Sequence, residues 1–260
     1  MHNFITLLPD IVQNLTQDNK LYEYESANKW LAQVLQHNLQ GGEKKRGLSL
    51  LQSYRILAAP EDVEPNNIRK AQIMGWCVGN GKIKHTNIQT RGDHSLDLFT
   101  MNRYSAIVQY TASHPSFKLP VMLALNMAGI QDPEIHRQAS TILKEMGQFY
   151  QVQKDNHNFE SDNPAAEDDI ANRKCSWLAV VALQRVTKAQ REILQENYGS
   201  EDPEKIRTVK NLYHELGLPS VFKRYENHSY ELLCTQIQQI SRGIPHRVFL
   251  HFLDKWTHRD

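Results

Sequence analysis

The chain of 260 residues is 40% hydrophobic and 23% charged, which is the composition of an ordinary globular protein with a buried core. Its 30 basic and 29 acidic residues give a formal net charge of +1, so no one-sided field favours nucleic acid or an anionic membrane as a partner. No window approaches the run of about eighteen apolar residues that a membrane span needs, and we expect a cytoplasmic protein with no nucleic-acid partner and no membrane span.

The segment 79–95, GNGKIKHTNIQTRGDHS, is the first clear break in a helical pattern. It is polar and contains three glycines, which is typical of a loop. Its opening Gly79-Asn80-Gly81-Lys82 has neither the spacing of a P-loop nor a Ser or Thr after the lysine. A turn is therefore the preferred interpretation of these glycines.

Residues 134–153 predict a long amphipathic helix. Apolar residues recur there at spacings of three and four, the period of a helix with one buried face: Ile135, Ala139, Ile142, Met146, Phe149 and Val152. Asp132-Pro133-Glu134 gives the helix a capping side chain, a proline where no amide donor is needed, and an acid at the positive end of the dipole. The next residues, 154–169, are acidic and short of apolar side chains, which predicts a polar loop.

The last third of the chain repeats this helical pattern. Apolar stripes lie within 178–186 and 221–237, Thr187 and Gln190 form a capping box, and Asp202-Pro203-Glu204 begins another helix. No alternating strand pair with a turn signal is present. The sequence predicts an all-α protein with a single domain over residues 1–260.

Generic metal motifs are weak in this sequence. Cys77, Cys175 and Cys234 lie far apart and in no CxxC pair, which indicates reduced thiols and not a disulfide or zinc framework. Asp168-Asp169-Ile170-Ala171-Asn172 places oxygen ligands at a spacing that suits magnesium. Two acids also suit the first turn of a helix, and a helix start is the preferred interpretation.

Several segments follow one another in the order of a single enzyme family. They are GGEKKRG at 41–47, FTMNRY at 99–104, EMGQFYQVQ at 145–153, KCSWL at 174–178 and QENYGSEDPEK at 195–205. Together they resemble the farnesyl diphosphate synthases, particularly those of insects, over nearly the whole chain except the loop at 79–95. The resemblance implies an isoprenoid-synthase-type bundle of long helices around a central cavity, and a truncated and diverged member of the polyprenyl synthase family.

The resemblance also implies an ancestral chemistry, that of isoprenoid biosynthesis. Those enzymes are prenyltransferases that join isopentenyl diphosphate to an allylic diphosphate by ionising the allylic partner. Magnesium ions held by two DDxxD motifs stabilise the leaving diphosphate, and basic side chains bind its remaining oxygens. Magnesium is accordingly the cofactor expected if activity remains, and no cofactor is expected otherwise.

The stretch QVQKDNHNF matches the second aspartate motif with only one of its three acids. Lys154 replaces the first aspartate, Asp155 is retained, and Asn158 replaces the third. A unit charge and a divalent ion at about 4 Å and an effective dielectric of about 20 repel by roughly 8 kcal/mol before screening. Lys154 is therefore expected to disfavour magnesium, and Asp155 is the only metal-site acid that the resemblance retains.

The first aspartate motif is absent. In the family, the segment matching GWCV continues into an apolar helix, the DDxxD, an arginine pair and further helices. Here Val78 is followed by the loop 79–95 and then by FTMNRY. The resemblance therefore implies a bundle that lacks two or three helices around the first motif. Thr90-Arg91-Gly92 as a relic of the arginine pair, and residues 92–98 as a relic of a later segment, both remain open.

Other contacts implied by the resemblance are altered. Glu43 stands where the family has a lysine that binds isopentenyl diphosphate, with Lys44 and Lys45 as candidate replacements. The Lys-Thr pair of the allylic site falls on Thr111-Ala112. The retained substrate-binding residues are Arg46, Gln151 and Lys174, and no catalytic residue is assigned.

Two hypotheses of different class remain open. The first is a catalytically impaired or inactive relative, or pseudoenzyme, that serves as a scaffold or dimer partner; a paralogue without a role is equally compatible. A chain that lacks core helices has apolar faces to cover, so a homodimer or a heterodimer with an active prenyl synthase is the expected assembly. The second is a residual prenyltransferase or a terpene synthase, which requires Asp155, Asp168 and Asp169 to form a replacement metal site near Lys174 and Gln151.

Overall fold

A computed structural model of the chain describes residues 7, 9–10, 44–79, 95–160, 169–240 and 243–256. These ranges contain helices and turns and no strand, which confirms the predicted all-α class. None of the helices in them is long and apolar enough to cross a membrane. The chain divides into two compact units, and the single domain over residues 1–260 stays a prediction.

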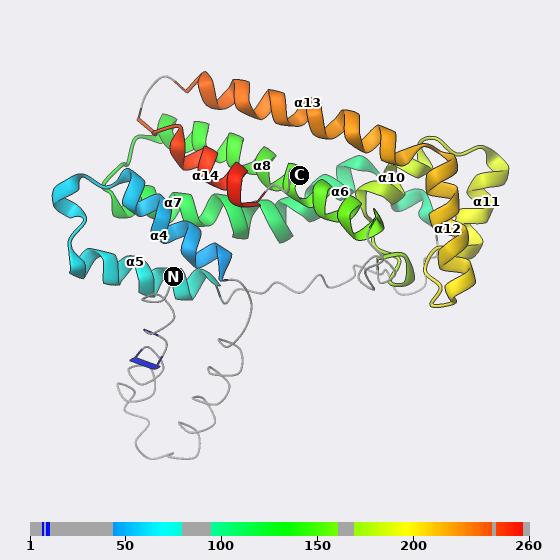
Figure 1. Ribbon diagram of the computed structural model, residues 1–260, viewed down its shortest axis with the longest axis horizontal. Coiled ribbons are helices and arrows are strands. Elements are labelled where there is room, and N and C mark those ends of the chain that lie inside the picture. The colour runs from blue at the N-terminus through cyan, green and yellow to red at the C-terminus, as the bar shows by residue number, and fades with distance from the viewer. Residues whose placement is uncertain are drawn as a thin grey trace, which may run out of the picture. The chain divides into compact units, whose positions relative to one another are not determined.

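Unit 1 contains residues 7, 9–10, 44–79, 115–139 and 243–248 among those described. Its helices α4 (Lys45–Leu57), α5 (Pro65–Gly79) and α7 (Leu119–Met127) pack on one another (Figure 1). The Tyr54 hydroxyl donates a hydrogen bond of 3.0 Å to the carbonyl of Asp62, which ties α4 to the turn η1 (Pro60–Asp62). The core of this unit consists of Leu50, Leu51, Tyr54, Ala71, Trp76, Val78 and Ala124.

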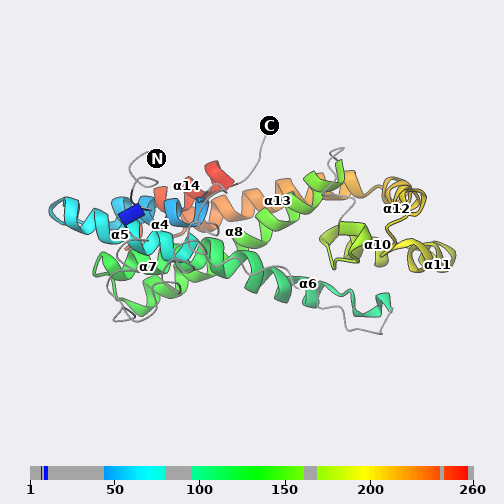
Figure 2. The same ribbon diagram turned by 90° about the horizontal axis from the view of Figure 1, so that it is seen from below.

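Unit 2 contains residues 95–114, 140–160, 169–240 and 249–256 among those described. Helices α10, α11 and α12 gather at one end of it, and α13 lies along the part of α8 that belongs to the same unit (Figure 2). Its elements, including those that cross its border, are η2 (Leu96–Leu98), α6 (Met101–Val108), the π-helix η3 (Gln109–Lys118), α8 (Pro133–Glu160), α10 (Trp177–Leu183), α11 (Lys188–Asn197), α12 (Pro203–Glu215), α13 (Leu218–Gln238) and α14 (Arg247–Trp256).

The predicted helix starts are confirmed. The backbone N–H of Glu134 donates to the Asp132 side chain at 2.8 Å, and that of Glu204 donates to Asp202 at 2.9 Å. Thr187 and Gln190 form the predicted reciprocal capping box. These caps depend only on neighbouring residues, which is why the sequence alone identified them.

The predicted polar loop at 154–169 is wrong in its first part, because α8 continues to Glu160. Asp155, Asn156 and Phe159 are all buried and extend the inner face that begins with Val152. The helix therefore continues through residues whose polarity suggested a loop. Residues 161–168 lie outside the described ranges, and residues 169–171 form a short helical turn.

The apolar stripe predicted on 221–237 is correct except at Leu232. Phe222, Leu233 and Ile237 are buried, whereas Leu232 is 45% exposed. Leu232 and Leu233 are neighbours on the helix, about 100° apart around its axis, so only one of them can point directly into the core. Of the three cysteines, which are all free thiols, Cys77 is exposed.

A close contact between η3 and α8 sets the spacing of these helices in unit 2. A Cβ atom built on Gly147 would lie 2.4 Å from the Cα of Ser113, which is shorter than any real Cβ contact. Only the absence of a side chain at position 147 allows the two backbones to approach so closely. Gly147 thereby fixes the start of the α8 segment that carries Gln151 and Asp155.

Candidate functional site

Asp155, which the resemblance predicts to be the retained acid of the second motif, is buried and accepts hydrogen bonds on both oxygens. Its Oδ2 accepts hydrogen bonds from the Tyr104 hydroxyl at 3.1 Å and from the backbone N–H of Trp177 at 3.0 Å. Its Oδ1 accepts one from Gln151 Nε2 at 2.7 Å. Burial raises the pKa of this carboxyl to about 6, against the hydrogen bonds, which lower it. Asp155 thus joins α6 and the start of α10 to α8.

Asp169 and Lys174, which are five residues apart in the chain, form an ion pair. Asn158 Nδ2 donates to the other carboxylate oxygen of Asp169 at 3.4 Å. The Tyr198 hydroxyl donates to the Lys174 carbonyl at 2.6 Å, and Arg173 Nη1 donates to the Tyr198 carbonyl at 2.5 Å. Lys174 is therefore held by Asp169 and by the segment around Tyr198, and its ammonium is already neutralised.

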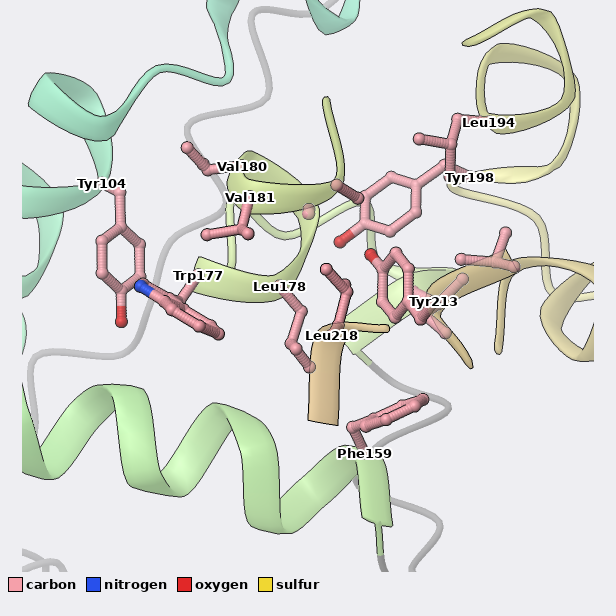
Figure 3. Close-up of a cluster of buried hydrophobic side chains, with 14 of the residues drawn as sticks. Tyr104, Phe159, Trp177, Leu178, Val180, Val181, Leu194, Tyr198, Tyr213 and Leu218 are labelled. Carbon is pink, nitrogen blue, oxygen red and sulfur yellow. The ribbon is translucent and has the colours of Figure 1, made fainter. Parts of the chain in front are cut away.

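Asp155 and Asp169 line the same small pocket in unit 2. The pocket lies beside the buried aromatic cluster in which Phe159, Tyr198 and Tyr213 surround Leu178 and Leu218 (Figure 3). Its polar lining residues are Asp155, Asp169, Ser176, Lys210 and Tyr213, and its apolar ones are Phe159, Ile170 and Leu178. The structure therefore brings together two of the three acids that a replacement metal site needs; the third, Asp168, lies outside the described residues.

The two substituted positions of the motif, Lys154 and Asn158, lie in different surroundings. Lys154 is exposed, whereas Asn158 is half-buried and hydrogen-bonded to Asp169. Asn156, between them, is buried. The face of α8 that carries Asp155 thus belongs to the core, and Lys154 lies on the solvent side.

Arg46 and its neighbours belong to unit 1. Arg46 Nε donates to the hydroxyl of the buried Ser116 at 3.0 Å, and Lys44 Nζ lies 5.2 Å from the centroid of the Trp76 ring. Gln151 and Lys174 are in unit 2. The three residues predicted to bind substrate are thus engaged within their own units. Glu43 and residues 80–94 lie outside the described ranges.

Thr111 and Ala112 offer no replacement for the allylic-site pair. The Thr111 hydroxyl donates to the Ile107 carbonyl at 2.8 Å, a bond within its own helical stretch, and Ala112 is buried. A hydroxyl that returns to the backbone four residues earlier is a common arrangement in helices. Neither residue provides a charged group for a diphosphate.

The donor set around Asp155 does not fit magnesium. Magnesium requires oxygen ligands in an octahedral arrangement, with carboxylates directed at the ion. Three protein donors already occupy the Asp155 carboxylate, and Lys174 neutralises Asp169. Within the described residues no group of three or more His, Cys, Asp and Glu side chains converges as a metal site would require.

The sequence analysis did not predict two of the buried polar contacts. Tyr104, inside the segment FTMNRY, bonds Asp155 across 51 residues of chain. The buried Glu226 accepts a hydrogen bond of 2.9 Å from Gln153 Nε2 and one of 2.9 Å from Lys223. The only available signal for Glu226 was an acid within an apolar helical stripe, which equally suits an exposed position.

Comparison with known proteins gives the descent of the chain. The Polyprenyl synthetase family matches residues 81–216. The farnesyl pyrophosphate synthase of Nezara viridula is 35% identical over 328 aligned positions, which cover 97% of this chain and 81% of that enzyme. The enzyme of the same name from Murgantia histrionica is 33% identical, with 97% and 80% covered, and that of Gallus gallus is 32% identical, with 97% and 90% covered.

The same fold is present in solved structures of T. brucei farnesyl pyrophosphate synthase. One has a TM-score of 0.82 at 19% identity and covers 98% of this chain and 99% of that one. Another, complexed with a bisphosphonate, has a TM-score of 0.79 at 18% identity and covers 98% of each chain. These likenesses confirm the predicted isoprenoid-synthase-type helical fold.

The alignment also shows that positions present in the relatives are missing from within this chain. The match to the Nezara viridula enzyme spans 328 positions and this chain has 260 residues, so at least 68 positions have no counterpart here. The helix α8 has 28 residues, so 68 positions correspond in length to two or three such helices. That is the number of helices predicted to be missing. A family match over more than half of the sequence and a relative at 35% identity along nearly all of it establish that the chain belongs to the polyprenyl synthetase family.

Proposed function

We propose that this chain is a polyprenyl synthetase relative that does not ionise prenyl diphosphates and serves as a scaffold or as one subunit of a dimer. The observation that carries the proposal is the state of Asp155. All three of its hydrogen bonds come from protein donors, and they connect three helices of unit 2. An acid whose oxygens are occupied by these donors connects the three helices and is not available as a metal ligand.

The second support is the ion pair of Lys174. A lysine that binds a diphosphate must be free to contact its oxygens, and the charge of Lys174 is instead satisfied by Asp169. Displacing Asp169 would leave a carboxylate at 11% side-chain exposure without its cation, which is costly in a poorly hydrated site. Anion binding at Lys174 is therefore opposed by the fold itself.

The partner part of the proposal is supported by the 68 or more missing positions. Helices absent from a bundle leave faces that water solvates poorly, and a second subunit is one way to cover them. Unit 2 exposes four large apolar side chains among its described residues, namely Tyr110, Ile193, Leu232 and Leu250. We propose a homodimer or a heterodimer with an active polyprenyl synthetase, to be tested by sedimentation of the chain alone and in mixture with that enzyme.

The alternative function is a residual prenyltransferase or terpene synthase. The specific observation in its favour is that Asp155 and Asp169 line one pocket together with Lys210. Such an enzyme would have to release Asp155 from its donors and Asp169 from Lys174 when the metal and diphosphate bind. That rearrangement gives it a clear experimental signature.

The experiment is a thermal melt with and without magnesium, each in the presence and absence of a bisphosphonate. We expect no shift in Tm in the combined condition, while an active farnesyl diphosphate synthase run in parallel shifts by several degrees, because a ligand stabilises the state that binds it. A shift that needs both components, followed by product from labelled isopentenyl and geranyl diphosphates, would establish the alternative.

A further inference from the structure

Glu226 is an acid in the middle of the buried, otherwise apolar face of α13. Its side chain is 7% exposed. The nearest buried residues of the helix on either side are Phe222, four residues earlier, and Leu233, seven residues later, and this spacing keeps all three on one face. Burying a carboxylate costs more free energy than burying an apolar side chain of similar size. Stability alone therefore does not account for an acid at this position.

The partners of Glu226 come from two different helices. Gln153 Nε2, on α8, donates a hydrogen bond of 2.9 Å to Glu226 Oε1, and Lys223 Nζ, on α13 itself, donates one of 2.9 Å to Oε2. Gln153 is buried, whereas the Lys223 side chain is 69% exposed. Lys223 lies on the same helix as Glu226 and moves with it. Of these two bonds, the one from Gln153 therefore depends on where α13 lies along α8.

The apolar residues of α13 define its position along α8 only weakly. An apolar stripe repeats every three or four residues, so a shift of the helix by one turn, about 5.4 Å, again places an apolar face on its neighbour. A shift of four residues would bring Phe222 or Tyr230 to the place of Glu226. The buried carboxylate would then lose the Gln153 amide, which is costly. From these contacts we propose that Glu226 and Gln153 fix the register of α13 on α8.

The register of α13 matters for the surroundings of Asp155. The Trp177 ring contacts two rings of α13, those of Tyr225 and Phe222, with centroid distances of 5.3 and 6.2 Å. Trp177 is also the residue whose backbone N–H donates to Asp155. A slip of α13 by one turn would remove both rings from Trp177. The register pair thus selects one packing of the residues next to Asp155, whether or not the protein has turnover.

The test replaces both polar side chains by an apolar one of similar size, Gln153→Met with Glu226→Met. The protein is labelled with fluorotryptophan, and the fluorine resonance of Trp177 is assigned with Trp177→Phe. In the double variant we expect this resonance to split or broaden, because the rings of α13 take more than one position beside it. The urea midpoint should be unchanged or higher, as for other buried ionic groups exchanged for apolar ones. Leu233→Met, in the same buried stripe, is the control and should keep one sharp resonance.

Two results would overturn the proposal. One sharp Trp177 resonance in the double variant means that a single register persists without the pair; a lowered urea midpoint would then show a contribution to stability only. Splitting in Leu233→Met as well means a general loosening of the core. Should the double variant fail to fold, Glu226→Met is compared with Glu226→Gln, whose amide oxygen can still accept from Gln153. Splitting in the first and not in the second supports the proposal, and the same spectrum in both contradicts it.

Discussion

The backbone N–H of Trp177 donates a hydrogen bond of 3.0 Å to the carboxylate of Asp155, 22 residues earlier in the chain. Trp177 is the first residue of α10, whose N-cap Ser176 satisfies the N–H of Ala179. Two of the N–H groups that a helix leaves unpaired at its start are thus satisfied, one locally and one by a distant acid. An acid that the resemblance assigns to a metal-binding motif thus satisfies the start of another helix.

Asp155→Asn should preserve this arrangement while removing a pH dependence. The pKa of Asp155 is raised from 3.8 to about 6, chiefly by burial. The folded state therefore binds this proton more tightly than the unfolded state does, so stability falls as pH rises from about 4 to about 6 and is constant above that. The shift corresponds to a loss on the order of 3 kcal/mol at neutral pH.

An asparagine can accept from Tyr104 and Trp177 with its oxygen and face Gln151 with its amide, once the Gln151 amide turns over. We expect the stability of the native protein relative to Asp155→Asn to decline between pH 4 and 6 and then level off, measured by urea unfolding across that range. Asp155→Ala, which deletes the acceptor, should lose several kcal/mol at every pH. A difference between native and Asp155→Asn that grows with pH contradicts this account.

Lys174 and Asp169 should be coupled in stability. We expect Asp169→Asn and Lys174→Met each to destabilise the protein, and the double variant to lose less than the sum, with a coupling energy of about 1–3 kcal/mol. The reason is that either single change leaves a partly buried charge without its partner. Unfolding in denaturant measures the cycle, and Arg207 with Glu204, an exposed pair on α12, is the control pair with a coupling below about 1 kcal/mol. Additive losses would mean that the two side chains do not depend on each other.

Gly147→Ala should destabilise the protein although alanine favours helices. Its Cβ would meet the Cα of Ser113 at 2.4 Å and the Ser113 hydroxyl at 2.5 Å, so a backbone has to move. Overpacking of this kind costs about 1–3 kcal/mol, against a gain of about 1 kcal/mol in helix propensity. Thermal unfolding should show a net loss for Gly147→Ala and almost none for Gln148→Ala, the neighbouring position on the same helix. A raised Tm for Gly147→Ala would mean that η3 and α8 are not in contact there.

The sequence by itself determined the helices, their starts and the family. The spacing of Ile142, Met146 and Phe149 and the caps at Asp132, Thr187 and Asp202 depend on residues within a turn or two, so local physics suffices to identify them. The segments that resemble prenyl synthases lie in a fixed order, and the family match confirms what they indicated.

The tertiary structure alone decided what the remaining polar residues do. Whether Asp155 meets a metal or the donors of Tyr104 and Trp177 depends on groups 51 and 22 residues away, and no local pattern records their approach. The same holds for the end of α8, where Asp155 and Asn156 resembled a loop and are buried in a helix. A polar side chain can be buried only where distant partners satisfy it, so its role is fixed by packing and not by its neighbours in sequence.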